Sequence, residues 1–241
     1  MKLANATFGF LSALLFIGLL FIPEISSSQS NDNVTRTEIR EMVNTNCIPV
    51  RQTTETSGSP YLFDEFIDGA VVLANRKTTD VLPIRYNSYK QTLEFRDGNY
   101  AYEMNPDHVN AFEMYIDDTV YKFTKGYDAR RLSNDEFVRL IIDDDVKFMV
   151  KHSTSFQEAV ASYGSATQQD KYTSDESFYI KVGEGNVNRI RRLNKRLVMR
   201  NIDSHEREVR DFADENNIDF SDPDDVEDLL LHYNSLLEQS E

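Results

Sequence analysis

The sequence has one cysteine and no tryptophan among its 241 residues. With Cys47 as its single cysteine, the chain cannot form an internal disulfide, so the hydrophobic core has to stabilise the fold. Cys47 does not follow the leucine and small residues that precede a lipid-modified cysteine, and no histidine lies near it in the sequence. We therefore expect a small side chain or a free thiol there, without a catalytic role.

The motifs that carry common enzyme chemistry are also missing. The four histidines form no close-spaced HxH or HxxxH pair, so no zinc site is predicted; they are His108, His152, His205 and His232. There is no glycine-rich phosphate loop, no GxSxG motif and no HExxH motif. Acids are so frequent that no one pair can be chosen as general acid and base. We predict no catalytic or cofactor-binding residue and expect a protein that is not an enzyme.

Two acidic runs were compared with a calcium loop, which alternates its ligands and holds a glycine at the sharp turn. The first run, Asp143-Asp144-Asp145, is consecutive and has no glycine. In the second run Pro223 and a helix start explain the first acids without a metal; its members are Asp222, Asp224, Asp225 and Asp228. The spacing therefore predicts no metal site at either place.

Positive charge is scarce, and the formal net charge is −15. This balance excludes an electrostatic footprint for nucleic acid or for an anionic membrane surface. Residues 186–200 nevertheless hold six arginine or lysine residues and no acid, whereas residues 201–241 hold fourteen acids and two arginines. One interpretation is a solvated acidic face balanced by a packed basic helix. The other is a docking surface, with the basic helix for an anionic partner or the acidic helices for a basic one.

The first part of the chain contains an apolar run. Met1-Lys2 carries a positive charge, residues 8–23 are nearly all apolar, and Ser26, Ser27 and Ser28 follow. The run of about 16 residues is shorter than the ~20 that a spanning helix needs. Residues 1–28 are therefore predicted to be a signal peptide, cleaved near Ser28 and Gln29, with an uncleaved anchor as the alternative. Cleavage implies a periplasmic or cell-surface protein that keeps no stable membrane span.

Residues 29–58 are predicted to be a polar lead and linker, with a short helix over residues 37–43 and a folded domain that starts close to Pro60. Residues 59–182 are predicted to be a sheet region. The expected strands cover residues 67–74, 81–89, 92–95, 100–104, 108–116, 119–124, 137–142, 146–151 and 177–182.

Short polar turns such as Asp97-Gly98-Asn99 join these strands, and the first six leave no room between them for helical crossovers. The pattern therefore predicts an antiparallel meander, as a half-barrel or a sandwich. Phe112, Met114 and Ile116 alternate with polar residues and should face the core. Pro83 cannot donate a ladder hydrogen bond, which indicates an edge strand or a bulge.

Residues 186–241 are predicted to be a helical region packed on the sheet, which makes the fold class α+β. One helix is expected from Asn186 and a second over residues 204–216. Ser221 is expected to cap the last helix, with Pro223 in its first turn. This helix carries an apolar stripe that should contact the sheet: Val226, Leu229, Leu230, Tyr233, Leu236 and Leu237.

Several motifs resemble those of uncharacterised exported proteins of Bacteroidota and their relatives. They are the entry Ser59-Pro60-Tyr61-Leu62-Phe63, Gly69 in the first strand, and Arg85-Tyr86-Asn87 with Tyr89, Leu93 and Phe95. The stretches LIIDDDVKFMVKH, ENNIDF and LLLHYNSL are similar to the second hairpin and the helical end of that family, although Asp143-Asp144-Asp145 stands where a glycine-containing turn is expected. The resemblance covers about residues 59–238 and implies a fold, with no activity.

These features predict an exported, non-enzymatic protein of the cell envelope with a binding or scaffolding role, whose partner is another envelope protein or a hydrophobic ligand. The alternative is a periplasmic carrier of a lipid or small hydrophobic ligand, because a curved sheet rich in phenylalanine and tyrosine can enclose an acyl chain. A hydrolase built from scattered acids and histidines is the third interpretation. The carrier needs an open concave face on the sheet. A concave face filled by side chains would therefore favour the binding protein or the hydrolase over the carrier.

Overall fold

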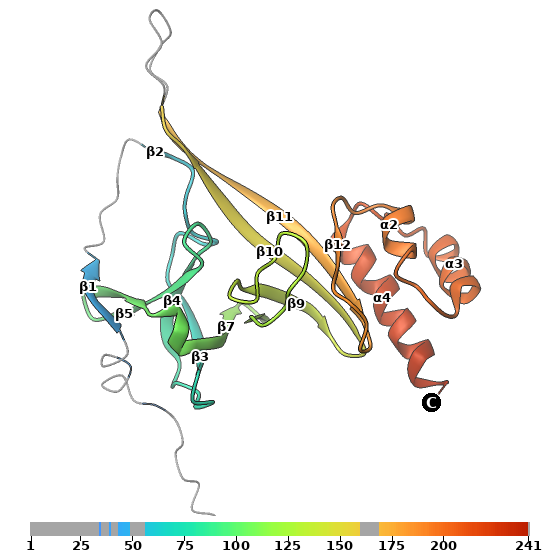
Figure 1. Cartoon of the computed structure of the whole chain (residues 1–241), viewed down its shortest axis with the longest axis horizontal. Coiled ribbons are helices and arrows are strands. Elements are labelled where there is room, and N and C mark those ends of the chain that lie inside the picture. The colour runs from blue at the N-terminus through green and yellow to red at the C-terminus, as the bar shows by residue number, and fades with distance from the viewer. Residues whose placement is uncertain (1–33, 35–38, 40–42, 49–55, 160–168, 241) are drawn as a thin grey trace, which may run out of the picture. The chain divides into compact units, whose positions relative to one another are not determined.

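The described part of the chain forms one open sheet, with helices that follow it in the sequence (Figure 1). The computed structural model describes residues 34, 39, 43–48, 56–159 and 169–240, with residues 43–48 described by their backbone alone. All of these residues belong to a contact unit that begins at Asp32. The predicted α+β class, an antiparallel sheet with C-terminal helices, is confirmed.

Strands come first along the chain and helices last. The strands are β1 (Val43–Ile48), β2 (Thr56–Ser57), β3 (Ile67–Leu73), β4 (Leu82–Asn87), β5 (Thr92–Asp97), β6 (Tyr100–Met104), β7 (Val109–Ile116), β8 (Thr119–Thr124), β9 (Val138–Asp143), β10 (Val146–Gln157), β11 (Asp170–Val182) and β12 (Asn188–Ile190). A 3-10 turn, η1 (Pro106–His108), precedes β7, and the helices are α2 (Lys195–Met199), α3 (Glu206–Glu215) and α4 (Pro223–Glu238).

The sheet combines two antiparallel meanders. Within the described residues it has twelve strands, and the path runs β1-β6-β5-β4-β3-β7-β8-β9-β10-β11-β12. The remaining strand, β2, pairs in parallel with β11. After β6 the turn η1 brings the chain back, so that β7 pairs with β3 instead of β6. The strands β3 to β6 therefore extend toward one edge of the sheet and β7 to β12 toward the other.

Gly69 lies where β3 contacts both meanders, opposite Leu82 of β4 and Met114 of β7. A Cβ atom at this position would lie 2.2 Å from the carbonyl oxygen of Glu113 and 2.5 Å from Cδ1 of Ile84. Only glycine lacks that atom, so only glycine lets the three strands approach this closely.

Aromatic rings fill the core of the first part of the sheet. Phe112 of β7 and Phe123 of β8 stack with ring centroids 4.5 Å apart. The Tyr86 ring lies 5.3 Å from Phe112, and the Phe137 ring lies 5.2 Å from Phe112 on another side. All four side chains are at most 1% exposed. The rings therefore occupy the space that an apolar ligand would need at this place.

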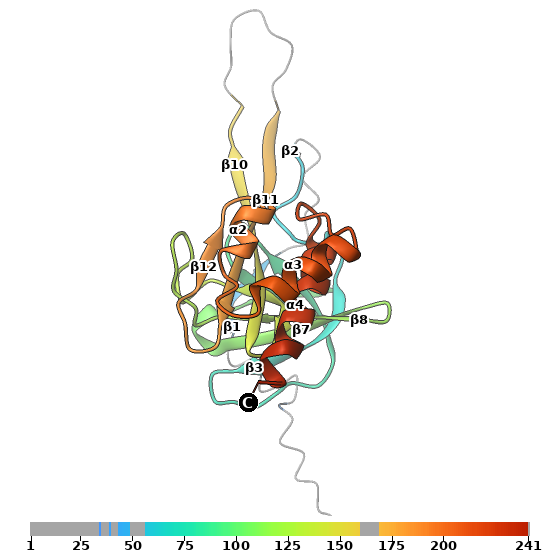
Figure 2. The same ribbon diagram turned by 90° about the vertical axis from the view of Figure 1, so that its right-hand side faces the viewer.

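Helix α4 lies against β9 and β10 (Figures 1 and 2). The contact is made by the predicted apolar stripe. Val226, Leu229, Leu230 and Tyr233 are buried, and Leu236 and Leu237 are partly buried. Asn234 adds a polar link to the β9–β10 turn. Its Oδ1 accepts from the Val146 amide at 3.1 Å, and its Nδ2 donates to Asp144 at 3.0 Å. The aspartate turn therefore connects the sheet to the helix.

The prediction for Pro83 is wrong, because β4 lies between β3 and β5 and not at an edge. Strand β3 pairs with β4 over three residue pairs only, with Pro83 opposite Asp68. A ladder this short loses little from one missing N–H group. Ile116 is half-buried near the β7–β8 turn, whereas Phe112 and Met114 are fully buried as predicted.

The first predicted helix begins nine residues later than Asn186, at Lys195. The residues before it form β12, in which Ile190 pairs with Phe178 and joins the helical core. Asn194 then caps α2, since its side chain accepts from the Leu197 amide at 3.0 Å. At α4 the cap is Asp222 and not Ser221, because the Asp222 carboxylate accepts from the Asp224 amide at 2.9 Å.

Two segments contain more strand than the pattern indicated. Strands β10 and β11 pair from Val146 and Val182 as far as Gln157 and Lys171, although their outer parts are polar. The outer part of this pairing is mostly exposed and has no continuous buried face, so it shows no apolar alternation. In the predicted lead, β1 pairs with β6 and β2 with β11, so the sheet includes residues before Pro60. The helix expected over residues 37–43 falls mainly outside the described residues.

Candidate functional site

A tight turn between β8 and β9 presents two adjacent arginines. Ala129 and Leu132 exchange both backbone hydrogen bonds, each at 3.0 Å, so Arg130 and Arg131 occupy the two central positions of the turn. Arg131 has φ 65°, the left-handed region that glycine or asparagine adopts more easily. The strained backbone places two exposed guanidinium groups at the tip of the turn.

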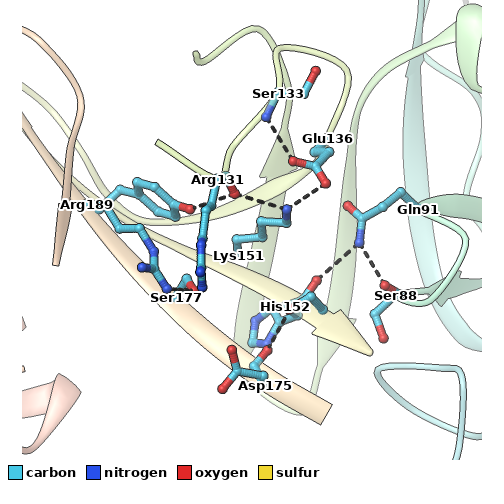
Figure 3. A network of polar contacts seen from close by, with 12 residues as sticks. Ser88, Gln91, Arg131, Ser133, Glu136, Lys151, His152, Asp175, Ser177 and Arg189 are labelled. Atoms are coloured by element: carbon cyan, nitrogen blue, oxygen red, sulfur yellow. Dashed lines mark hydrogen bonds and ion pairs between the residues drawn. The ribbon is translucent and has the colours of Figure 1, made fainter. Parts of the chain in front are cut away.

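The turn is fixed by its neighbours. Leu132 is buried with Met149, Tyr179 and Val138 in a small apolar cluster. The carbonyl oxygen of Arg131 accepts from the Tyr179 hydroxyl at 3.1 Å and from Lys151 Nζ at 3.3 Å (Figure 3). Strands β10 and β11 thus each supply one donor that holds the Arg131 backbone in place.

Two further arginines come from β12 and from the bend that follows it. Arg189 pairs with Tyr179 of β11, so this tyrosine contacts both the turn and β12. Arg191 directly follows the strand, and the buried Ile190 separates it from Arg189. The Nη2 of Arg189 donates to Ser177 Oγ at 3.0 Å, and its Nε is buried without an acceptor.

The two segments meet around a cavity of about 230 Å³ that is lined by Arg130, Arg131, Arg189 and Arg191. None of these four arginines forms an ion pair with a carboxylate in the described ranges. Guanidinium groups stay protonated at any physiological pH, and like charges repel when they are brought together. We call this cavity the arginine pocket; it is a concentration of positive charge on a strongly acidic chain.

The tyrosine beneath the arginine pocket is held in its neutral form. Burial raises the pKa of the Tyr179 hydroxyl, against the opposing effect of the Arg189 guanidinium. The hydroxyl therefore keeps its proton and donates it to the Arg131 carbonyl. Tyr179 positions the turn and adds no negative charge to the site.

A second cavity adjoins Arg131 on the β10 side and contains an ion pair. Lys151 Nζ lies 2.6 Å from the Glu136 carboxylate, which also accepts from the Ser133 amide at 2.8 Å (Figure 3). The Glu136 carboxylate is thus already bound to its own cation and amide. Asp128, which precedes the turn, lines the same cavity and forms no ion pair with the four arginines in the described ranges.

A third cavity contains the groups that would most favour a hydrolase. His152 Nδ1 lies 3.1 Å from Glu176, and this hydrogen bond lowers the pKa of the Glu176 carboxyl. Ser88 lines the same cavity, but its hydroxyl lies 2.8 Å from Thr154 Oγ1 and 3.2 Å from the Pro60 carbonyl. His152 Nε2 is buried with no partner. No nucleophile is hydrogen-bonded to the imidazole, so the arrangement lacks the central contact of a serine–histidine pair.

The other residues considered in the sequence lie apart from the arginine pocket. His108 is exposed in η1, His205 precedes α3, and His232 stacks on Phe212 with ring centroids 4.1 Å apart. Cys47 lies in β1, opposite Tyr102. Among the residues with described positions, no group of three or more metal-binding side chains is placed to hold an ion.

The basic residues of the segment 186–200 lie in two different environments in the structure. Arg189 of β12 and Arg191, the residue after that strand, join the arginine pocket, whereas Lys195 of α2 lies 3.1 Å from Asp214 of α3. The counter-charge interpretation thus holds for Lys195, and the docking interpretation stays a prediction. Arg130 and Arg131 were missed by the sequence analysis; the available signal was an arginine pair in a polar connection between two strands.

Comparison with known proteins does not assign the site. No family model, no curated protein and no solved structure matches the chain. Of the helices in the described ranges, none is long and apolar enough to cross a membrane. A function for the arginine pocket must therefore be inferred from its own geometry.

Proposed function

We propose that this chain is an exported, non-enzymatic binding protein of the cell envelope, and that its ligand is a small anion held in the arginine pocket. The observation that carries the proposal is that four arginines line one cavity without a carboxylate partner in the described chain. Such a cluster has an unfavourable self-repulsion, which a bound anion removes. Guanidinium groups also bind carboxylate and phosphate oxygens through paired hydrogen bonds.

Binding without chemistry fits the groups present. Arginine donates hydrogen bonds but does not exchange protons at physiological pH. Tyr179 is neutral with its proton directed at a backbone carbonyl, and Glu136 is bound to Lys151 and Ser133. The arginine pocket thus offers donors to hold an anion and no free acid, base or nucleophile to transform it.

Export is the part of the proposal that rests on the sequence. The apolar residues 8–23 followed by three serines favour a cleaved signal peptide over an anchor. The resemblance of residues 59–238 to exported proteins of Bacteroidota agrees with this and stays a prediction. We do not extend the proposal to a carrier of lipids, because the rings of Tyr86, Phe112 and Phe123 fill the core where an acyl chain would lie.

Calorimetric titration of the purified protein with sulfate, phosphate and acetate tests the binding proposal. We expect one site per chain for at least one of these anions and no heat of binding with neutral glycerol. In the Arg131→Gln/Arg191→Gln double variant the affinity should fall about 100-fold, because each charged hydrogen bond contributes ~1.5–3 kcal/mol. Arg207→Gln is the matched control, since Arg207 is 90% exposed on α3 and outside the pocket.

Arg207→Gln removes one positive charge without touching the arginine pocket, whereas the double variant removes two, so the control should bind as the wild type does. Binding of no anion, or equal binding by the double variant, would overturn the proposed site. Export is tested separately by mass spectrometry of the protein recovered from cell fractions. We expect a mass without residues 1–28 and a location outside the cytoplasm; a full-length cytoplasmic protein would contradict export.

A further inference from the structure

We propose that the anion in the arginine pocket is a phosphate dianion, either free or as the terminal group of a small monoester, and not a carboxylate. This inference deepens the anion-binding function proposed above and rests on it. It follows from the charge of the arginine pocket, from the directions of its donors and from its size.

The charge of the arginine pocket exceeds what a carboxylate can balance. Four arginines line the cavity, and none of them is paired with a carboxylate among the described residues. In the adjoining cavity Glu136 is paired with Lys151, and Asp128 is the other carboxylate beside Arg131. A carboxylate carries one negative charge, whereas a phosphate monoester carries about −1.5 to −2 at neutral pH. The dianion therefore relieves more of the repulsion between the arginines.

The donors approach the cavity from two separate segments. Arg130 and Arg131 come from the turn closed by Ala129 and Leu132, whereas Arg189 comes from β12 and Arg191 from the residue after it. A planar carboxylate has two oxygens, which a single guanidinium fork can already satisfy. A tetrahedral phosphate presents at least three terminal oxygens in different directions. It can thus accept from the turn and from β12 at the same time.

The size of the cavity limits the ligand to a small group. Its volume of about 230 Å³ is below the ~300–1,000 Å³ typical of pockets for drug-sized molecules. Arg130, Arg131 and Arg191 are exposed, so the cavity opens to solvent on their side. A terminal phosphate fits inside, and the remainder of a monoester would extend outward without contacting the core.

If the ligand is a dianion, its affinity should depend on pH, because a phosphate monoester loses its second proton near pH ~6. The charged and titratable groups around the arginine pocket are its four arginines, Tyr179 of β11, the Lys151–Glu136 pair and Asp128 beside the turn. The arginines keep their charge, and the tyrosine stays neutral. Sulfate remains a dianion throughout, so it reports any titration of the protein itself.

The test is calorimetric titration of the full protein with inorganic phosphate, sulfate and acetate between about pH 5 and pH 8, across the second phosphate ionisation. At neutral pH we expect phosphate and sulfate to bind at least about tenfold more tightly than acetate. As pH falls below the second ionisation of inorganic phosphate, which lies above that of a monoester, its affinity should fall about tenfold per unit, while the sulfate affinity stays constant. Equal binding of acetate and phosphate would overturn the dianion and leave the anion site standing. Binding of none of the three would overturn the anion site itself.

Two variants separate shape from charge. Arg131→Lys/Arg191→Lys keeps the charge but removes two planar forks, so phosphate binding should weaken while Arg207→Lys has no effect. If the lysine double variant binds phosphate as tightly as the wild type, the donor geometry argued above is wrong.

A third measurement shows whether the phosphate comes from a soluble ester or from a lipid. It compares the binding of glycerol 3-phosphate in solution with binding to phosphatidylcholine vesicles that contain phosphatidic acid. Binding of the soluble ester identifies a free metabolite. Binding to the vesicles alone identifies a lipid headgroup, and both outcomes support the phosphate dianion. If inorganic phosphate binds and neither ester does, the pocket takes the free ion.

Discussion

The Tyr179 hydroxyl donates to the Arg131 carbonyl at 3.1 Å, and the same tyrosine pairs with Arg189 across β11 and β12. One buried side chain thus connects the two segments that form the arginine pocket. Each segment is a short structure with few contacts of its own, a four-residue turn and a three-residue strand. The convergence of their guanidinium groups depends on this connection.

Replacing Tyr179 by phenylalanine tests this connection. The ring would stay in its apolar cluster, but the Arg131 carbonyl would keep only Lys151 as a side-chain donor. We expect a loss of about 0.5–1.5 kcal/mol in the free energy of unfolding and weaker phosphate binding at constant stoichiometry. Urea denaturation and calorimetry measure the two effects. Unchanged phosphate affinity would show that the hydroxyl does not position the arginines.

A buried ion pair should dominate the stability of the β4–β5 region. Arg85 Nη2 lies 2.7 Å from Glu94, whose side chain is 1% exposed, and the guanidinium is covered by the Tyr61 ring at 3.7 Å. Glu94→Gln would leave a buried unpaired cation, and we expect a loss of about 3–5 kcal/mol by urea denaturation. Breaking the exposed Lys90–Glu103 pair with Lys90→Gln should cost less than ~1 kcal/mol. Equal losses would contradict this account.

The close approach at Gly69 should not tolerate even a methyl group. In Gly69→Ala the added carbon would meet the Glu113 carbonyl oxygen, a backbone atom that cannot rotate away. We expect a loss of about 1–3 kcal/mol, as for other overpacked positions. Gly98→Ala serves as the control, because a Cβ there meets no atom within 4 Å, although the residue has φ 60°. A neutral Gly69→Ala would mean that β3 can shift between its neighbours.

Tyrosine ionisation should weaken the fold at high pH. Burial raises the pKa of Tyr61 from 10.0 to about 12. Between these values the unfolded chain loses this proton and the folded chain keeps it, so the free energy of unfolding falls as pH rises. The contribution is complete below pH 10 and is lost as pH passes through 12. Urea denaturation at several alkaline pH values should show a shallower decline for Tyr61→Phe. An identical decline would exclude Tyr61 as a contributor.

The sequence pattern was sufficient to predict most strands, because the alternation in residues 109–116 and the turn at Gly98 are local signals. It did not predict the pairing of β7 with β3, because this pairing joins residues about 40 positions apart and the local sequence carries no signal for it. It misplaced the start of the first helix because Ile190 suits both a helical period and a strand that pairs with β11.

The candidate site was only half visible in the sequence. Arg189 and Arg191 belong to the basic segment 186–200, which the sequence analysis identified, whereas Arg130 and Arg131 lie in a polar connection about 60 residues away. Their convergence depends on the placement of β12 beside β11 and on the bond from Tyr179. Neither contact follows from composition or spacing, so the arginine pocket could be recognised only in three dimensions.

The most direct test of the central claim, that the arginine pocket binds an anion, is to follow the arginine Nε–H NMR signals during a phosphate titration. Assignments come from single Arg→Gln variants. The account predicts that the signals of Arg131, Arg189 and Arg191 shift together with one dissociation constant, while that of the exposed Arg207 does not move. Shifts of equal size at Arg207 and at the pocket arginines, or no shift at Arg189, would contradict the claim.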